Sequence, residues 1–262
     1  GEWPLRHELK LYIRKDTLAT LWDYGTGATA VVPPVDPYAE GELTPQLSMV
    51  INESGFMGAN DGQLTLPRNV AVGENGRLYV ADSGNNRIQV FDAAGDFSHS
   101  WGSSGSGIGE FSEPWGLVVD EEFVYVADTW NHRIQKFTLD GEFVAILGVG
   151  GAAAPDDTGG GLGLFFGPRD IELLPDNQLL VSDTGNHRLQ IISRDGDPLA
   201  QVGGWGVLLG QFNEPVGLAT SPVDGSVFVA DTWNGRLQQF TPDLFALNEW
   251  PVPFARIGQL VR

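Results

Sequence analysis

The chain has 262 residues, of which 42% are hydrophobic, which is enough for one large domain with a packed core. Its formal net charge is −19, from 34 acidic and 15 basic residues, and it contains no cysteine. The acidic surface disfavours nucleic acid and anionic lipid as partners, and the lack of cysteine excludes disulfides and thiolate metal sites. Since no apolar run is long enough to span a membrane, we expect no direct membrane insertion by this segment.

Residues 1–43 do not follow the pattern of the rest of the chain, and we expect an N-terminal extension with a linker there. Leu9, Leu11 and Ile13 alternate as in a strand, and Asp16 is placed to cap a short helix. The proline-rich run at 31–37 predicts a stiff, extended linker. A second domain is therefore predicted over residues 44–262.

Four near-copies of an eleven-residue string dominate this second domain. They are ADSGNNRIQVF, ADTWNHRIQKF, SDTGNHRLQII and ADTWNGRLQQF, and they begin at Ala81, Ala127, Ser182 and Ala230. A repeat of about 50 residues predicts one supersecondary unit that is used several times, with each copy packed against its neighbours.

Each unit contains four short apolar stretches that are separated by turn residues. A proline-led stretch comes first, as at 66–72, and a strand such as LYVAD follows. The second half of the string, such as RIQVF, is the third stretch, and a segment such as 143–148 is the fourth. This order predicts four-stranded antiparallel blades that are arranged radially, which makes the domain an all-β propeller.

These strings resemble the NHL repeat, whose signature is close to VADTGNHRIQVF, and Thr184–Arg188 matches it closely. The resemblance implies an NHL propeller over residues 44–250. Because proteins with this propeller include scaffolds, RNA binders and peptide-amidating lyases, it implies no single activity.

Residues 3–25 are similar to the segment that precedes the NHL propeller in bacterial multi-pass membrane glycosyltransferases of the dolichyl-phosphate-mannose type. This similarity implies a bacterial protein with an extracytoplasmic or cell-surface location. The chain begins at Gly1 without a methionine, so we expect the membrane tether to be encoded outside this chain.

Four full repeats are visible, although NHL propellers commonly have six blades. Leu47–Ile51 matches the fourth strand of a preceding blade, and residues 254–261 match the beginning of a following one. We therefore expect either a composite blade that both ends of the chain build or a ring that stops short of closure. The sequence leaves both possibilities open.

Several recurring polar residues are predicted to serve the scaffold, because catalytic groups are rarely copied into every repeat. We expect a structural ion pair between the Asp and the Arg of each string, and a Gln that satisfies buried backbone groups. His132 and His187 occupy one turn position of the string, and a metal site that used them would need a third ligand. The acidic loop at 155–161 is expected to be flexible surface or a partner contact.

The variable positions of the repeat are predicted to share one end of the propeller, because the turn inside each string and the loop between blades emerge together. The candidate ligand-binding residues there are Arg68, Trp115, Arg169 and Asp170, at the start of the inner strands, and Trp130 and Trp233, in the turns. A basic and aromatic rim suits an anionic group or a sugar ring that stacks on indole. The alternative is that the tryptophans pack between blades.

We therefore expect a non-catalytic binding or scaffold module that recognises a protein, a peptide or a glycan on this end of the propeller. The sequence contains no nucleophile motif, and we assign no catalytic residue, metal or cofactor. The alternative is a metal-dependent hydrolase or lyase with its site in the central channel. That function needs converging ligands on the inner strands, where the sequence offers Asp170 and Glu172.

Overall fold

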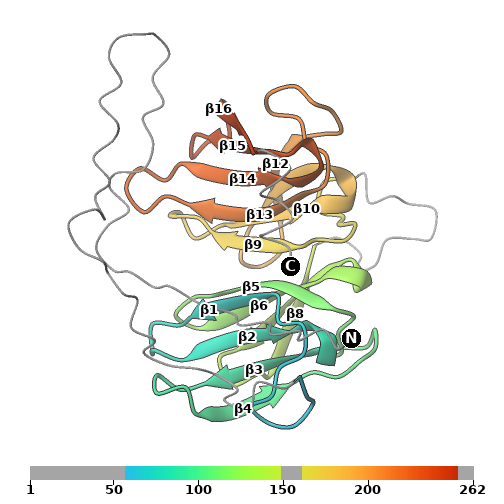
Figure 1. The fold of residues 1–262 in the computed structure, drawn as a ribbon, viewed down its shortest axis with the longest axis vertical. Helices are drawn as coiled ribbons and strands as arrows, with labels where there is room; N and C mark the ends of the chain where they lie inside the picture. The colour runs from blue at the N-terminus through green and yellow to red at the C-terminus, as the bar shows by residue number, and fades with distance from the viewer. Residues whose placement is uncertain (1–56, 149–160, 253–262) are drawn as a thin grey trace, which may run out of the picture. The chain divides into compact units, whose positions relative to one another are not determined.

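The structure, a computed structural model, describes residues 57–148 and 161–252 (Figure 1). In these residues the chain forms four antiparallel sheets, each of four strands in chain order. The features predicted at 1–43, Leu47–Ile51 and 254–261 lie outside the described residues, as does the acidic loop at 155–161 except for its last residue. No helix in the described ranges is long and apolar enough to cross a membrane.

Each sheet is one blade, and the blades are numbered here in chain order. Blade 1 consists of β1 (Asn69–Val72), β2 (Leu78–Asp82), β3 (Arg87–Phe91) and β4 (Phe97–Trp101). Blade 2 consists of β5 (Pro114–Val119), β6 (Phe123–Asp128), β7 (Arg133–Thr138) and β8 (Phe143–Leu147). Blade 3 consists of β9 (Asp170–Leu173), β10 (Leu179–Asp183), β11 (Arg188–Ile192) and β12 (Pro198–Gly203). Blade 4 consists of β13 (Pro215–Thr220), β14 (Val227–Asp231), β15 (Arg236–Phe240) and β16 (Ala246–Pro251).

The first strands of the blades lie together at the centre of the domain. β1 contacts β5, β5 contacts β9, and β9 contacts β13, and Figure 1 shows β5 beside β9. This arrangement confirms the predicted all-β propeller.

A short 3₁₀ turn joins the second strand of each blade to the third. The turns are η1 (Ser83–Asn85), η2 (Thr129–Asn131), η3 (Thr184–Asn186) and η4 (Thr232–Asn234). The residue after each turn is left-handed, with φ between 54° and 62°, and it is Asn86, His132, His187 or Gly235. Glycine and small polar residues tolerate this conformation best, which explains why no β-branched residue occurs at this position of the string.

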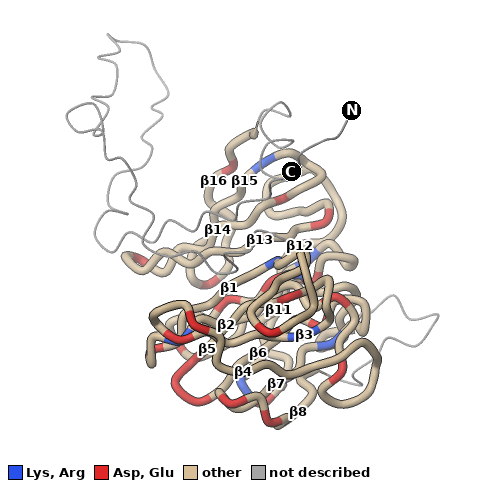
Figure 2. Tube along the Cα trace, turned by 60° about the horizontal axis from the view of Figure 1, so that its bottom comes forward, with Lys and Arg blue, Asp and Glu red and all other residues tan. Residues whose placement is uncertain are grey.

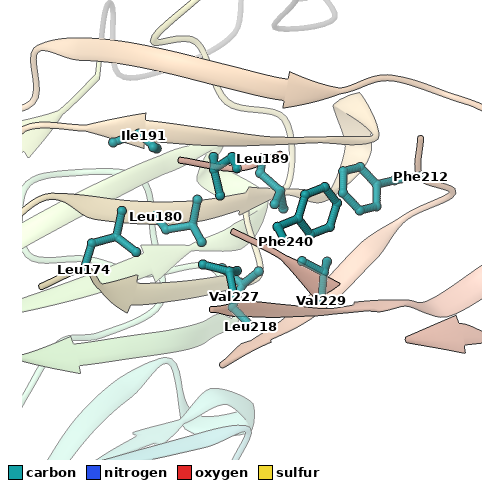
Figure 3. Packing of buried hydrophobic residues seen from close by; sticks show 10 residues of the cluster. Leu174, Leu180, Leu189, Ile191, Phe212, Leu218, Val227, Val229 and Phe240 are labelled. Atoms are coloured by element: carbon teal, nitrogen blue, oxygen red, sulfur yellow. The ribbon is translucent and has the colours of Figure 1, made fainter. Parts of the chain in front are cut away.

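Hydrophobic cores fill the spaces between neighbouring blades. Between blades 3 and 4, Leu180 and Leu189 pack against Val227, Val229 and Phe240 (Figure 3). The residues of β10 and β11 are buried on both faces, because blade 3 has a described blade on either side. Along β14 and β15, in blade 4, buried residues alternate with half-buried ones.

Candidate functional site

Each blade contains one buried Asp–Arg pair. In all four blades the arginine Nε lies 2.7 Å from a carboxylate oxygen of the aspartate, whose side chain is fully buried. The pairs are Asp82–Arg87, Asp128–Arg133, Asp183–Arg188 and Asp231–Arg236. The predicted structural role of the pair is confirmed.

The arginine and glutamine of each string also hold the loop that leads into their own blade. In blade 2, the Arg133 guanidinium donates to the carbonyl oxygens of Ser106, Gly107 and Glu110, over 2.6–3.0 Å. Gln135 donates to Glu110 O and accepts a hydrogen bond from a loop N–H. The predicted role of the glutamine is therefore confirmed, and these loops have a fixed backbone. We call the end of the propeller that carries these loops and the 3₁₀ turns the top face.

Two contacts join the 3₁₀ turn of one blade to the first strand of the next. His132 Nδ1 accepts a hydrogen bond from Gly167 N over 2.9 Å, and the Thr129 hydroxyl donates to Pro168 O over 2.8 Å. His187 and Thr184 make the same contacts to Glu214 and Pro215. Asn86 and Ser83 make them at the junction of blades 1 and 2, to Glu113 and Pro114. We call this pair of contacts the junction clamp.

The clamp holds a backbone conformation that is otherwise unfavourable. The residue before each leading proline has φ between 48° and 59°, and it is Leu66, Glu113, Gly167 or Glu214. Residues with a side chain rarely adopt positive φ, and a following proline restricts them further. By fixing this residue and its proline, the clamp positions the residue that follows the proline, which is Trp115, Arg169 or Val216.

The sequence places the two histidines in this turn, but their hydrogen bonds to the next blade were not predicted from it. The sequence did contain a sign of this contact. The position after the turn is Asn86, His132 or His187 in blades 1 to 3, and each of these side chains has a hydrogen-bond acceptor two atoms beyond Cβ. Since Nδ1 accepts a hydrogen bond, each ring carries its proton on Nε2 and is neutral. Burial lowers the pKa of His132, although the charges of Asp183 and Asp128 oppose this effect.

The structure brings three of the candidate residues into one stack. The guanidinium carbon of Arg68 lies 4.3 Å from the centroid of the Trp115 ring, and that of Arg169 lies 4.4 Å from it. Arg68 comes from blade 1 and Arg169 from blade 3, on either side of the blade that carries Trp115. The register of β5 with β6 shifts between Pro114 and Leu117, so Trp115 lies in a bulge, a device that redirects a side chain.

The two arginines of this stack keep their N–H groups available. Within residues 57–148 and 161–252, neither the Arg68 nor the Arg169 side chain makes a hydrogen bond or an ion pair. Burial lowers the pKa of Arg169, the charge of Arg68 lowers it further, and Glu214 and Glu113 raise it. Two guanidinium groups with free donors are suited to bind a carboxylate or a phosphate.

Asp170, the fourth residue of the predicted rim, joins three blades. Its carboxylate accepts hydrogen bonds from Asn69 Nδ2 of blade 1 over 3.3 Å and from Leu218 N of blade 4 over 2.8 Å. Burial raises its pKa to about 6. Glu172 lies two residues further along β9. Burial and the charge of Asp170 raise the pKa of Glu172 to about 7. This arrangement suits a structural connection better than direct contact with a ligand.

The remaining two candidates lie on the top face without joining the stack. Trp130 is 49% exposed and Trp233 is 64% exposed. Trp233 Nε1 donates to a carboxylate oxygen of Glu214 over 2.8 Å, and Glu214 also acts on Arg169 electrostatically. The alternative prediction, that tryptophans pack between blades, applies to Trp101, which packs against Tyr79 and Phe137.

One apolar surface of the structure was not predicted from the sequence. Trp205, Val207, Leu208 and Leu209, in the loop between β12 and β13, are 45–72% exposed. The signal was available in the sequence, because the matching loop before blade 2 has Ser104, Ser106, Gly107 and Ile108 at these positions. In the described parts of the chain, no three His, Cys, Asp or Glu side chains form a group that could hold a metal ion.

Family models match two parts of the chain. Residues 62–150 match a family described as a 6-bladed β-propeller (DUF5128), and residues 165–192 and 212–240 match the NHL repeat. Among curated proteins, RING finger protein nhl-1 of Caenorhabditis elegans is 38% identical over 64 residues, which are 24% of this chain and 7% of that protein. E3 ubiquitin-protein ligase TRIM71 of Gallus gallus is 49% identical over 45 residues, which are 17% of this chain and 5% of that protein.

Solved structures show the same fold at low identity. A streptogramin B lyase has a TM-score of 0.52 and 19% identity, over 70% of this chain and 54% of the lyase. A chain of a nidogen–laminin complex has a TM-score of 0.51 and 20% identity, over 72% of this chain and 64% of that chain. The chain thus spans a small part of its curated relatives and somewhat more than half of these propellers.

Proposed function

Because the chain is a β-propeller that carries NHL repeats, we propose that it is a non-catalytic binding module that recognises a carboxylate of a protein or peptide on its top face. The observation that carries this proposal is the stack of Arg68, Trp115 and Arg169. Stacking on the indole holds each guanidinium in place, and its N–H groups remain free among the described residues. A carboxylate that reaches the stack gains charge-assisted hydrogen bonds without first breaking an ion pair.

The stack favours an anionic group over a sugar ring at this position. A sugar binds tryptophan by lying on the face of the indole, and here guanidinium groups from the two neighbouring blades lie over the Trp115 ring. A local basic group is also the feature that lets an acidic ligand approach a chain with a net charge of −19. Figure 2 shows how the acidic positions, in red, are spread over the blades.

The proposal predicts which substitutions abolish binding. Panels of immobilised peptides and glycans are probed with the unaltered chain and with the Arg68→Ala, Arg169→Ala and Trp115→Ala variants. We expect peptides with Asp, Glu or a free carboxyl terminus to be retained, and each variant to weaken binding by about tenfold or more. Arg77→Ala is the matched control, because it removes the same charge from a side chain that already pairs with Asp140. Binding that is unchanged in all three rim variants overturns the proposal.

The location and the larger context are proposed on the sequence alone. An extracytoplasmic or cell-surface position, as part of a larger membrane protein related to the glycosyltransferases named above, is supported by the similarity of residues 3–25. Fractionation of cells that express the full open reading frame tests this part of the proposal.

A further inference from the structure

The loop before blade 4 has the same backbone framework as the loop before blade 2 but a different surface. Arg236 donates to the carbonyl oxygens of Val207 and Leu208, as Arg133 does to those of Ser106 and Gly107. Asn234 donates to Gly206 O, as Asn131 does to Gly105 O. The two loops therefore differ in side chains and not in how they are held.

This framework keeps four apolar side chains in solvent. Trp205 is 72% exposed, Val207 and Leu208 are each 68% exposed, and Leu209 is 45% exposed. Asn234 holds the loop at Gly206, Gln211 Oε1 accepts from Leu208 N, and Gly210 N donates to Gln238, so the loop backbone is bound along the apolar run. The loop before blade 2 has the same framework with one exposed apolar side chain, Ile108, so the three further apolar side chains at 205, 207 and 208 are not needed to hold the loop and indicate a contact surface.

The apolar loop is connected to the arginine stack through blade 4. Trp233 donates through Nε1 to Glu214, whose charge acts on Arg169, and its backbone N–H donates to Asn213 O. The next residue, Asn234, binds the loop at Gly206. The exposed Trp233 ring is therefore connected through Glu214 to the surroundings of Arg169, and the residue that follows it holds the backbone of the 205–209 loop.

We propose that the top face binds an extended segment of another protein in which an aspartate, a glutamate or a terminal carboxylate adjoins apolar side chains. The carboxylate binds at Arg68 and Arg169, and the apolar side chains lie on Trp233 and the 205–209 loop. The charge of the stack selects the acidic end of the segment, and the loop buries its apolar part. This inference rests on the proposed function, because it takes the stack as the carboxylate site.

A loop exchange tests the inference with the internal control that the chain provides. Trp205→Ser, Val207→Ser, Leu208→Gly and Leu209→Ile together give the 205–209 loop the side chains found before blade 2. The backbone contacts are retained, and a melting temperature close to that of the unaltered chain verifies this. The unaltered chain, the loop-exchange variant and the Arg169→Ala variant are each used to select from a library of random twelve-residue peptides displayed on phage. Affinities of the synthesised peptides are measured by calorimetry.

We expect the unaltered chain to enrich peptides that combine Asp or Glu with Leu, Phe or Trp. The loop exchange is expected to weaken these peptides at least tenfold while it leaves purely acidic peptides unaffected. If acidic peptides bind and the loop exchange changes nothing, the inference is wrong and the proposed function stands. If no enriched peptide depends on Arg169, both are wrong. Binding of phosphatidylcholine vesicles that the loop exchange abolishes, without any peptide preference, also overturns the inference, because it assigns the loop to a lipid surface.

Discussion

His132 in blade 2 accepts a hydrogen bond of 2.9 Å from the backbone N–H of Gly167, which precedes the leading proline of blade 3. This contact ties the turn of one blade to the beginning of the next, and His187 repeats it between blades 3 and 4. Because the residue two positions after Gly167 is Arg169, the contact also positions one side of the arginine stack. Scaffold and candidate site therefore depend on the same hydrogen bond.

The first prediction concerns the pH dependence of this contact. Burial lowers the pKa of His132 in the folded chain below its ordinary value of 6.5. A lowered histidine pKa means that the unfolded chain binds the proton first, so the neutral ring contributes stability above pH 6.5 that is lost as the pH falls below it. In the His132→Asn variant, an amide oxygen replaces Nδ1, as at Asn86, and does not titrate. We expect this variant to lose less stability than the unaltered chain between pH 7.5 and pH 5.5.

Urea denaturation at both pH values measures this difference. His132→Ala serves as the second variant, because it removes the acceptor and also places alanine at a φ of 56°. We expect it to cost about 2 kcal/mol at pH 7.5, from the lost hydrogen bond and the left-handed backbone. An equal loss of stability on acidification in the Asn variant and the unaltered chain would contradict the assignment of His132 as the titrating group.

The second prediction concerns Glu172 and has the opposite sign. Burial and the charge of Asp170 raise the pKa of Glu172 to about 7. A raised carboxyl pKa favours the folded chain at low pH, and this contribution is lost as the pH rises from the ordinary value of 4.5 through about 7. We expect Glu172→Gln to increase stability by about 1–3 kcal/mol at pH 8.5 and to leave it unchanged at pH 4. Calorimetric melting at the two pH values distinguishes this outcome from a uniform change, which would exclude an ionisation effect.

The third prediction concerns the buried ion pairs. Arg133→Lys keeps the charge but cannot reach Asp128 and three loop carbonyls at once, since an ammonium lacks the planar fork of a guanidinium. We expect a loss of about 3 kcal/mol. Arg77→Lys is the matched control, because its pair with Asp140 is largely exposed and the same change there should cost less than about 0.5 kcal/mol. Similar losses in both variants, by chemical denaturation, would argue against the loop-holding role of Arg133.

The sequence was sufficient to predict what all four repeats share. The Asp, Arg and Gln of the string recur in every copy, and the ion pair and the role of the Gln toward buried backbone groups followed from this recurrence, whereas the contacts of the Arg with the loop did not. Arg68, Trp115 and Arg169 were grouped because each is the variable residue that follows the leading proline of its blade, and the structure stacks them.

Features that depend on one repeat differing from another were not predictable in the same way. The bulge that redirects Trp115 in blade 2 has an equivalent in blade 4. It has none in blade 3, where the register of β9 with β10 is regular. The local sequence pattern does not show which blades contain such a bulge. Asp170 was placed on the rim because it follows Arg169, but successive residues of a strand point to opposite sides, and its carboxylate joins blades 1, 3 and 4 instead.

The fourth prediction uses two glycines at equivalent positions of this bulge. A Cβ on Gly116 would lie 2.6 Å from Asp170 Cα and 2.7 Å from Arg169 O, so blade 2 can approach blade 3 only with glycine there. At Gly217, in blade 4, the nearest atom to an added Cβ is Ala230 Cβ, at 3.7 Å. We expect Gly116→Ala to cost about 2–3 kcal/mol and to separate Arg169 from Trp115, whereas Gly217→Ala changes stability by less than about 1 kcal/mol. Because Trp115 then loses one guanidinium, its fluorescence should change in the first variant only, in native buffer. Equal behaviour of the two variants in melting and fluorescence would show that the approach of β5 to β9 does not set the geometry of the arginine stack.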